Sequence, residues 1–566
     1  MRYYKLGICI ILILALVVIF AACGTETPAS TTDTTTSTQV IGTAPVTTTT
    51  NTTTESSAVT TSPTTTSSTG TAPTTTTAVD DFYKQKLDWP EEIVPSPKKV
   101  TLNGDKGYGL YLLKPAITSK DEAFTLYLDT FIGYTQKITG VTITKEDGGI
   151  VLQRDTTLGA GGYSLIATKD GVTVKAADND GITYALATLH QILEYEDGEL
   201  CVPAYTIYDR PDSSYRTLMV DLARKFHTLD QVLDYIDLCY LYKIKFLHLH
   251  FTDHEAYRLP SDAFSKLSSS QSYSKEEIAK LNQYALERNI EIIPEIDLPG
   301  HARSIISAYP NVFGHTATYG SVTSDVVCIG KPDFYNNLKV ILEEICEMFP
   351  NSRYLHVGGD EADFSSLTNC SDCGQYIFDH DITSLKMFYT YFIKNVTDMV
   401  LELGRTPIVW EGFPKEGAEM ISRDILVTGW ESLYHLPNDL VAEGFTVTNS
   451  SWLPLYIIPA NINSSVPKGR WQPEDILKWD IYTWRNWWSA SPASKKPIVI
   501  EPTDQVVGGS LCAWETTYKQ DITPIKENLA ALSERLWNVS GKVDVTEYMK
   551  ALNKLYAMAD KVLGDN

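Results

Sequence analysis

The chain has 566 residues, of which 43% are apolar and 11% aromatic, and this is enough for two or three domains with a large core. Its 70 acidic and 47 basic residues give a formal net charge of −23, and lysine and arginine form no block. Such a surface repels a polyanion, so the composition argues against a nucleic-acid partner.

Residues 1–23 have the pattern of an export signal, because Arg2 and Lys5 precede a long apolar run and small residues lead to Cys23. The segment resembles a bacterial lipoprotein signal, and this resemblance implies that Cys23 is lipidated after cleavage. The alternative is an uncleaved membrane anchor. Either interpretation places the rest of the chain outside the cytoplasm, at the cell surface and tethered to a bacterial membrane.

Residues 24–80 are dominated by threonine, with serine, proline and alanine and very few charged or large apolar side chains. A segment of this composition cannot bury a core. We predict a disordered, semi-extended stalk that carries no chemistry.

Residues 82–210 are predicted to form a small α+β domain. A helical pattern at 179–195 follows a hairpin whose turn is Asp170–Gly171. The strand-like runs lie at 124–131, 149–153 and 163–177.

Between residues 211 and 566, short apolar strands alternate with amphipathic helices. Two helices begin with capping boxes, Thr228 with Gln231 and Ser274 with Glu277. Eight βα units predict a closed (β/α)8 TIM barrel. An open doubly wound sheet is the alternative, but it does not require eight strands that each end in a polar or aromatic cluster. The predicted strands are 215–222, 246–253, 291–298, 354–361, 406–412, 424–430, 445–452 and 509–515.

The carboxyl ends of the strands of such a barrel share one face, where active sites lie. In this sequence the strand ends carry charged groups that alternate with indoles, a pattern typical of a pocket for one sugar ring. These residues are Asp221, Arg224, Asp253, Asp297, His301, Asp360, Glu361, Trp410, Trp430, Trp514 and Glu515.

Asp360 and Glu361 are adjacent, which is unusual for a pair of catalytic carboxyls. Ordinary glycosidases hold two carboxylates on opposite sides of the scissile bond, about 5 Å apart or about 6.5–9.5 Å apart. Adjacent residues do not easily straddle a sugar in this way. They suit a reaction in which one carboxyl serves the leaving-group oxygen and the other orients a nucleophile of the substrate, the carbonyl oxygen of a 2-acetamido group.

The segment HVGGDE at 356–361 resembles the signature of glycoside hydrolase family 20, the β-N-acetylhexosaminidases. The resemblance implies an exo-acting, retaining enzyme that removes terminal β-linked GlcNAc or GalNAc from glycans by substrate-assisted catalysis, without a cofactor. Segment 163–193 is similar to the family's accessory domain. Four further blocks resemble those of the family, in the same order: 220–227, 246–259, 292–301 and 528–538.

The resemblance implies that Glu361 is the general acid and then the base, and that Asp360 holds the acetamido N–H and stabilises the oxazolinium charge. The neighbouring charge of Asp360 is expected to raise the pKa of Glu361, as a general acid requires. Gly358 and Gly359 are expected to turn the backbone without placing side chains against the sugar.

The same resemblance assigns roles to the other strand-end residues. Arg224 is expected to bind sugar hydroxyls through its guanidinium. Asp253 and His301 are expected to position Glu361, with Asp297 orienting His301, and a loop histidine bonded to backbone is the alternative for His301. The residues expected to wall the acetamido group and the ring face are Trp410, Trp430 and Trp514.

The sequence departs from the family pattern at two places. Segment 450–458 has no aspartate where the family has Tyr-x-Asp, and Tyr456 is favoured over Trp452 for the aromatic role. Trp514 is followed directly by Glu515, where the family has Trp-x-Glu. Two alternatives therefore stay open: release of a disaccharide, as by a lacto-N-biosidase, and a surface lipoprotein that binds glycans without hydrolysis.

No metal site is predicted. Cys370 and Cys373 form a single C-x-x-C pair, interpreted as a local disulfide or as two thiols, because one pair without partners is weak evidence for zinc. The tryptophan-rich loop at 484–490 is either an outer subsite or packing. Three histidines inside predicted strands are interpreted as satisfied barrel residues: His248, His250 and His356.

Overall fold

The computed structural model describes residues 93–102, 110–196, 198–321, 324–459 and 472–564. The predicted signal at 1–23, with Cys23, and the predicted stalk at 24–80 lie outside the described residues. No helix within the described ranges is long and apolar enough to cross a membrane.

The first part of the described chain is a small α+β domain, as predicted. Its six-stranded sheet has the order β1, β9, β5, β6, β4, β3. The predicted hairpin pairs β5 with β6 and turns between Thr168 and Gly171. The strands of the two sheets in this domain are β1 (Lys99–Leu102), β3 (Ile117–Ser119), β4 (Ile150–Arg154), β5 (Tyr163–Thr168), β6 (Gly171–Ala176) and β9 (Tyr205–Asp209), and β2 (Leu110–Leu112), β7 (Glu194–Glu196) and β8 (Glu199–Pro203).

The prediction of a strand at 124–131 is wrong, because this segment forms the 3₁₀ helix η1 (Glu122–Tyr127) and the start of α2 (Leu128–Thr139). The buried side chains of the segment recur at helical spacing: Phe124, Tyr127, Leu128, Phe131 and Tyr134. Asp121 caps η1 by accepting the Ala123 N–H, which starts the helix where a strand was expected. The predicted helix at 179–195 is present as α3 (Asn179–Ile192).

The second part is a closed barrel of eight parallel strands, and the fold prediction is confirmed. The eight strands pair in chain order, and the first pairs with the last, β10 with β20. A short strand, β17 (Tyr456–Ile457), also adds to β20. The barrel strands are β10 (Tyr215–Asp221), β11 (Phe246–His250), β12 (Glu291–Leu298), β13 (Tyr354–Gly358), β14 (Thr406–Trp410), β15 (Leu426–Gly429), β16 (Thr446–Asn449) and β20 (Val506–Ala513).

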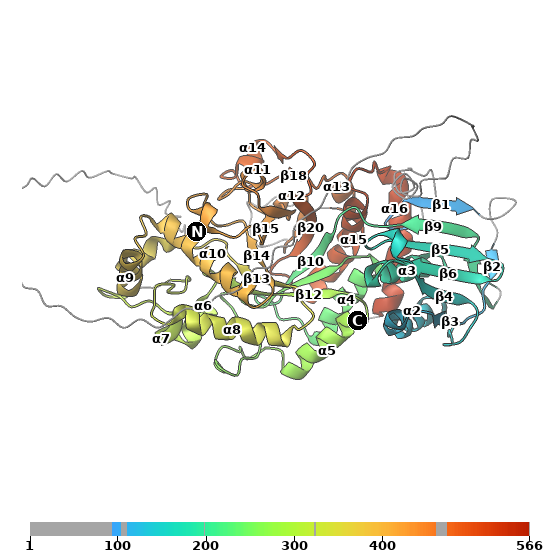
Figure 1. Cartoon of the computed structure of the whole chain (residues 1–566), viewed down its shortest axis with the longest axis horizontal. Helices are drawn as coiled ribbons and strands as arrows, with labels where there is room; N and C mark the ends of the chain where they lie inside the picture. The colour runs from blue at the N-terminus through green and yellow to red at the C-terminus, as the bar shows by residue number, and fades with distance from the viewer. Residues whose placement is uncertain (1–92, 103–109, 197, 322–323, 460–471, 565–566) are drawn as a thin grey trace, which may run out of the picture. The chain divides into compact units, whose positions relative to one another are not determined.

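Helices surround the barrel strands (Figure 1). Both predicted capping boxes are present, at Thr228 before α4 and at Ser274 before α5. The longer helices are α4 (Leu229–Leu241), α5 (Lys275–Leu286), α8 (Phe334–Met348), α10 (Leu385–Glu402), α15 (Tyr518–Trp537) and α16 (Val545–Leu563). Shorter elements include α6 (Arg303–Ala308), α7 (Pro310–Phe313), η3 (Phe364–Asn369), α9 (Ser371–Asp379), α11 (Pro437–Ala442), α12 (Trp452–Leu455), α13 (Pro473–Leu477) and α14 (Pro492–Lys495), with strands β18 (Thr483–Trp484) and β19 (Ile498–Val499).

A buried polar contact joins the α+β domain to the barrel. Lys243, which follows α4, lies 3.5 Å from the Asp209 carboxylate and donates to the Tyr163 hydroxyl at 3.1 Å. Trp537 of α15 donates its indole N–H to Asp209 at 2.8 Å. Burial lowers the pKa of Lys243 to about 8, against the opposing charge of Asp209. A buried ion pair, Lys243 with Asp209, therefore links the barrel to the α+β domain.

Candidate active site

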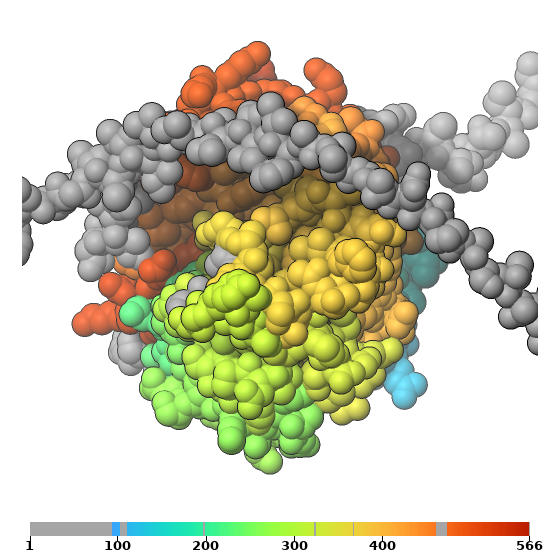
Figure 2. All heavy atoms as spheres, turned by 90° about the vertical axis from the view of Figure 1, so that its left-hand side faces the viewer, coloured from blue at the N-terminus to red at the C-terminus, as the bar shows by residue number. Residues whose placement is uncertain are grey.

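The loops that follow the barrel strands bring the predicted site residues to one face of the barrel. Figure 2 shows the molecule from this side, with the segments after β12 and β13 in yellow-green and yellow at its front. Asp221 ends β10, and His301 lies three residues beyond β12. Asp360 and Glu361 follow the two glycines at the end of β13.

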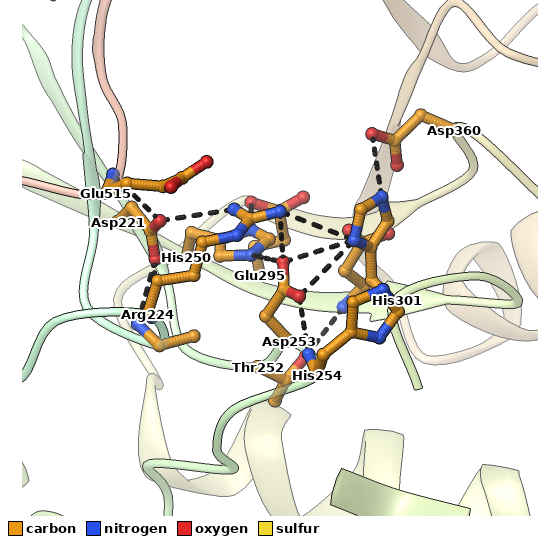
Figure 3. Close-up of polar contacts among 12 residues, drawn as sticks. Asp221, Arg224, His250, Thr252, Asp253, His254, Glu295, His301, Asp360 and Glu515 are labelled. Carbon is orange, nitrogen blue, oxygen red and sulfur yellow. Dashed lines mark hydrogen bonds and ion pairs between the residues drawn. The ribbon is translucent and has the colours of Figure 1, made fainter. Parts of the chain in front are cut away.

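A relay of side chains runs to Glu361, as predicted. Arg224 Nη2 lies 2.6 Å from Asp253 Oδ2, and His301 Nδ1 lies 3.3 Å from Asp253 Oδ1. On the other side of its ring, His301 Nε2 lies 3.3 Å from Glu361 Oε2 and 3.7 Å from Asp360 Oδ2. Figure 3 shows the His301 ring between Asp253 and Asp360. His301 thus contacts the expected general acid, and Asp253 contacts His301. The ring nitrogens of His301 lie against side chains, and not against backbone, in the described part of the chain.

Three residues of the site have a left-handed backbone, with φ of 49° at His301, 44° at Glu361 and 58° at Glu515. This region costs non-glycine residues free energy and is sparsely populated. Each of the three follows the carboxyl end of a barrel strand, where the chain turns toward the site. The tertiary structure therefore holds the catalytic face in conformations that the local sequence disfavours.

The pKa values of Asp360 and Glu361 shift in the opposite sense to the one expected from the sequence. The hydrogen bond from His301 lowers the pKa of Glu361, and the positive charges of His301 and Arg224 act in the same direction. Burial raises the pKa of Asp360 to about 6. The prediction that Asp360 raises the pKa of Glu361 is therefore wrong, because the Glu361 side chain is 50% exposed and paired to His301, whereas Asp360 is buried.

Asp297 is placed beside Asp360, and the structure gives His301 a different orienting partner. Both Asp297 and Asp360 have one buried carboxyl oxygen without a hydrogen-bond donor in the described part of the chain. Burial, and then the charge of Asp360, hold the pKa of Asp297 well above its usual range, and a hydrogen bond from Asp297 acts to lower the pKa of Asp360. Asp297 thus lies against Asp360 and His301, and Asp253 orients His301.

Gly358 makes room for Asp297 and not for a sugar, contrary to the prediction. A Cβ atom at Gly358 would lie 1.9 Å from Asp297 Oδ1 and 2.7 Å from Leu298 N, and the residue has a φ of 73°. The missing side chain therefore allows β13 to approach the end of β12, which brings Asp297 to Asp360.

We expect Gly358→Ala to destabilise the protein by about 3 kcal/mol or more, because it adds both a clash and a strained backbone. The matched control is Gly374→Ala in α9, where a Cβ meets nothing within 4 Å. In a helix this change stabilises by about 1 kcal/mol. Thermal unfolding of both variants checks the prediction, and equal melting temperatures would contradict it.

The predicted aromatic residues form one cluster at the carboxyl face. Trp410, Trp430 and Tyr456 are buried together, and Trp452 and Trp514 pack against them. The rings of Trp430 and Tyr456 lie parallel, with an interplanar angle of 4° and centroids 6.4 Å apart. Trp452 also stacks on Tyr456, with ring centroids 4.6 Å apart. Tyr456 therefore lies with the three predicted tryptophans, and Trp452 lies behind it.

Arg224 is held by carboxylates on both sides. Its guanidinium lies 3.2 Å from Asp221 and 2.6 Å from Asp253, and 5.3 Å from the centre of the Trp514 ring. The backbone N–H of Glu515 donates to Asp221 at 3.1 Å, which fixes the strand end next to Arg224 (Figure 3). Burial raises the pKa of the Glu515 carboxyl. Arg224 and Glu515 thus form one charged edge of the site.

Glu295, which the sequence analysis did not single out, lies against all three strand histidines. His248 and His250 are hydrogen-bonded to it, whereas His356 Nδ1 accepts the backbone N–H of Gly358 at 3.1 Å. Glu295 is fully buried in β12, and the three imidazoles surround its carboxylate. The nitrogen–oxygen distances are 2.9 Å for His248, 2.7 Å for His250 and 3.1 Å for His356. The other carboxyl oxygen also accepts the Trp410 indole N–H at 2.6 Å. The interpretation as satisfied barrel residues agrees with the contacts of His248 and His250, but His356 Nε2 is buried without a hydrogen-bond partner in the described part of the chain.

Two further carboxyls near the site, Glu411 and Glu431, were missed. Glu411 accepts four backbone N–H groups of residues 432–435, at 2.6–3.1 Å, and so holds the loop after β15. Glu431 is buried, and its Oε2 has no hydrogen-bond partner in the described part of the chain. Burial, and then the charge of Glu361, raise the pKa of Glu431 to about 8. The dipeptide Trp-Glu comes at the end of three barrel strands in the sequence, at 410–411, 430–431 and 514–515. This recurrence could have pointed to Glu411 and Glu431.

The tryptophan-rich loop at 484–490 has one buried tryptophan and two that lie nearer the surface or the aromatic cluster. Trp484 is fully buried and donates its indole N–H to the Gly429 carbonyl at 3.1 Å. Trp487 meets the edge of Trp452 with ring centroids 5.5 Å apart, and Trp488 is 38% exposed. The first of these tryptophans is core, and the second extends the aromatic cluster outward.

A closed barrel whose carboxyl face holds adjacent carboxyls, a histidine relay and an aromatic cluster is the arrangement expected of a glycoside hydrolase. Residues 214–540 match the model of the glycosyl hydrolase family 20 catalytic domain, and residues 91–210 match domain 2 of the same family. The chain therefore belongs to glycosyl hydrolase family 20.

Relatives with this fold and sequence come from several bacteria. The β-hexosaminidase of Vibrio furnissii is 29% identical over 311 residues, which are 50% of this chain and 50% of that protein. The β-hexosaminidase of Porphyromonas gingivalis is 30% identical over 276 residues, which are 44% of this chain and 35% of that protein. The chain thus spans half or less of the length of these two relatives.

Solved structures share the fold. An exo β-N-acetylglucosaminidase of Vibrio harveyi in complex with N-acetylglucosamine has a TM-score of 0.70 and 22% identity, over 85% of this chain and 80% of that chain. A β-N-acetylhexosaminidase of Bacteroides fragilis has a TM-score of 0.69 and 22% identity, over 83% of this chain and 96% of that chain. These similarities extend over both the α+β domain and the barrel.

Proposed function

We propose that the protein is an exo-acting, retaining β-N-acetylhexosaminidase that removes terminal β-linked GlcNAc or GalNAc from glycans by substrate-assisted catalysis. The observation that carries this proposal is the pairing of Glu361 with His301 directly beside the buried Asp360, next to the aromatic cluster. Only one of these carboxyls is exposed enough to reach a leaving-group oxygen. We assign the other, the buried Asp360, to the acetamido group, which Trp430 and Tyr456 would enclose.

In the first step the acetamido carbonyl oxygen attacks the anomeric carbon, and the bond from that carbon to the leaving oxygen breaks. Asp360 accepts the acetamido N–H and stabilises the positive oxazolinium ion, while Glu361 gives a proton to the leaving oxygen. In the second step Glu361 takes a proton from water, which opens the oxazolinium ring on the same face. Two inversions give net retention.

The proton for the first step comes from the His301–Glu361 pair. Burial disfavours the charged form of His301, but the surrounding carboxylates outweigh it and hold the pKa of His301 well above its usual value. In the free protein the pair is therefore His301⁺ and Glu361⁻. A bound sugar excludes water from both side chains, and a drier environment favours the neutral pair with the proton on Glu361.

The pH dependence of kcat/KM should report Asp360 in the free enzyme. Its carboxylate is the active form, and its pKa is about 6, so activity is full above this pH and is lost as the pH falls through it. We expect kcat/KM to fall about tenfold for each pH unit below the pKa. A pH profile on an aryl N-acetylglucosaminide checks this, and a profile that stays flat to pH values near the usual aspartate range would contradict it.

The part of the pocket that reads sugar hydroxyls supports a second candidate, release of a disaccharide such as lacto-N-biose. Ile458 stands where the family has the aspartate of Tyr-x-Asp, and it packs against the aromatic cluster. Glu431 and Glu515 are the nearby carboxyls that could bind hydroxyls instead. A longer pocket, in which no aspartate binds the sugar 4-hydroxyl, would accept a second sugar.

A panel of chromogenic β-glycosides of GlcNAc, GalNAc and lacto-N-biose separates the candidates. Our proposal predicts fast release from the monosaccharide substrates. Release from the lacto-N-bioside alone would favour the disaccharide enzyme. Glycan binding without turnover of any substrate would favour a non-hydrolytic surface protein and would overturn the proposal.

We also propose that the enzyme is exported and anchored at a bacterial cell surface through a lipid on Cys23. The support is the sequence pattern of residues 1–23 and the threonine-rich composition of residues 24–80. Expression in a bacterial host should place the wild-type chain in the membrane fraction. Cys23→Ser should lose incorporation of labelled fatty acid, and unchanged labelling would contradict the assignment.

A further inference from the structure

Four side chains that the proposed function does not use converge beside the site, namely His315, Cys328, Cys370 and Cys373. We call them the Cys3His cluster. All seven cysteines in the described part of the chain are free thiols in this structure, Cys370 and Cys373 among them. One ligand atom from each member of the cluster lies within 4.8 Å of all the others.

We propose that the Cys3His cluster binds one structural zinc ion. Zinc–sulfur bonds of about 2.3 Å in a tetrahedral site put neighbouring ligand atoms about 3.5–3.8 Å apart. Cys328 Sγ lies 3.6 Å from both Cys370 Sγ and Cys373 Sγ, and Cys373 Sγ lies 3.8 Å from His315 Nδ1. Three thiolates and one imidazole are a ligand set that selects zinc over the hard cations.

The His315 ring is already oriented for this role. Its Nε2 lies 2.8 Å from the Val326 carbonyl oxygen, which can accept only a hydrogen bond. The proton therefore sits on Nε2, and the lone pair of Nδ1 points toward the thiols. A backbone carbonyl on the second nitrogen is a common way to fix a histidine ligand of a metal. All three cysteines are buried, as in closed structural sites and unlike open catalytic ones.

The cluster joins the two loops that carry the proposed catalytic relay. His315 and Cys328 lie in the loop between β12 and α8, which also holds His301. Cys370 and Cys373 lie in the segment between β13 and α10, which begins with Asp360 and Glu361. A zinc ion would therefore tie the loop of the relay histidine to the loop of the catalytic pair.

Backbone contacts show that these two loops are built to meet at the cluster. Thr318 N donates to the Asn369 carbonyl at 2.9 Å, and Ser371 N donates to the Thr316 carbonyl at 3.0 Å. A Cβ atom at Gly330 would lie only 2.6 Å from Cys373 Cα, so a glycine is needed for this approach. The thiols are thus held close together by the fold on both sides.

A disulfide is the main rival, and it explains the arrangement less well. Cys328 is equally distant from both of its neighbours, so a bond to either one would leave the third thiol and His315 without a use. A disulfide also needs the two sulfurs at about 2.05 Å, and both Cys328 pairs are 3.6 Å apart, close to the spacing of two zinc ligands.

The test uses the full chain purified without chelators. We expect about one zinc per chain by elemental analysis. Exchange for Co²⁺ should give the thiolate charge-transfer band and the intense visible bands of a tetrahedral cobalt site. Cys328→Ser should lose most of the zinc, whereas Cys346→Ser, which changes a partly exposed thiol outside the cluster, should retain it.

The cobalt spectrum of the wild-type chain decides the question if Cys328→Ser fails to fold. Absence of both zinc and cobalt bands, with all thiols open to reagent after unfolding, would overturn the proposal. A mass lower by two hydrogens, with the thiols protected until reduction, would assign a disulfide instead. Metal content is measured without substrate, so this result is independent of the proposed hydrolase activity.

Discussion

Glu361→Gln is expected to lower kcat/KM by about 10²–10⁴ on glycosides with poor leaving groups, the range that general acid catalysis contributes. Glutamine keeps the shape of the side chain but cannot give a proton to the leaving oxygen. An aryl group that forms a stable phenolate needs little protonation, so substrates of this kind should lose far less. Kinetics on a series of aryl glycosides of graded leaving-group pKa measure both effects.

The matched control for this variant is Glu347→Gln, which changes an exposed glutamate of α8 away from the site. It should leave kcat/KM unchanged on every member of the series. An equal loss on good and poor leaving groups in Glu361→Gln would show that this carboxyl does not protonate the leaving oxygen.

Asp360→Asn is expected to lower kcat by about 10²–10³ on good and poor leaving groups alike. The amide removes the negative charge that stabilises the oxazolinium ion, and this ion forms in the first step whatever the leaving group is. The acid limb of the pH profile should disappear with the same change, because the group that titrates near pH 6 is gone.

Asp363→Asn is the control for Asp360→Asn, since Asp363 is an exposed N-cap three residues further along and asparagine caps helices equally well. Turnover near the wild-type level in Asp360→Asn would remove the role assigned to this residue. A loss on poor leaving groups only would exchange the roles of the two carboxyls.

The barrel could be predicted from the sequence because each strand is a short, fully buried run that ends in polar or aromatic residues. Parallel strands then bring those ends to one rim, so the residues of the site could be collected before any geometry was known. The prediction of a strand at 124–131 was wrong because a short apolar pattern is ambiguous. Alternation over a few residues also fits a helix whose buried positions recur every three or four residues.

The electrostatics of the site could not be predicted, because they depend on side-chain directions set by the tertiary structure. The adjacent positions of Asp360 and Glu361 suggested which pKa should rise, but His301 contacts one carboxyl and Asp297 lies against the other. The Cys3His cluster was hidden for the same reason. Cys328 lies 42 residues before Cys370, and only the folded loops bring the two together.

The central claim is that the substrate supplies the nucleophile. It is tested most directly by the rates on chromogenic β-glycosides whose 2-acyl group carries an increasing number of fluorine atoms, ending with the sugar that lacks the acyl group. Fluorine makes the carbonyl oxygen a weaker nucleophile, so the account predicts a steep fall in kcat along the series and a loss of about 10³-fold or more at its end. Rates that stay within about tenfold across the series would contradict it, since a protein nucleophile would be insensitive to that oxygen.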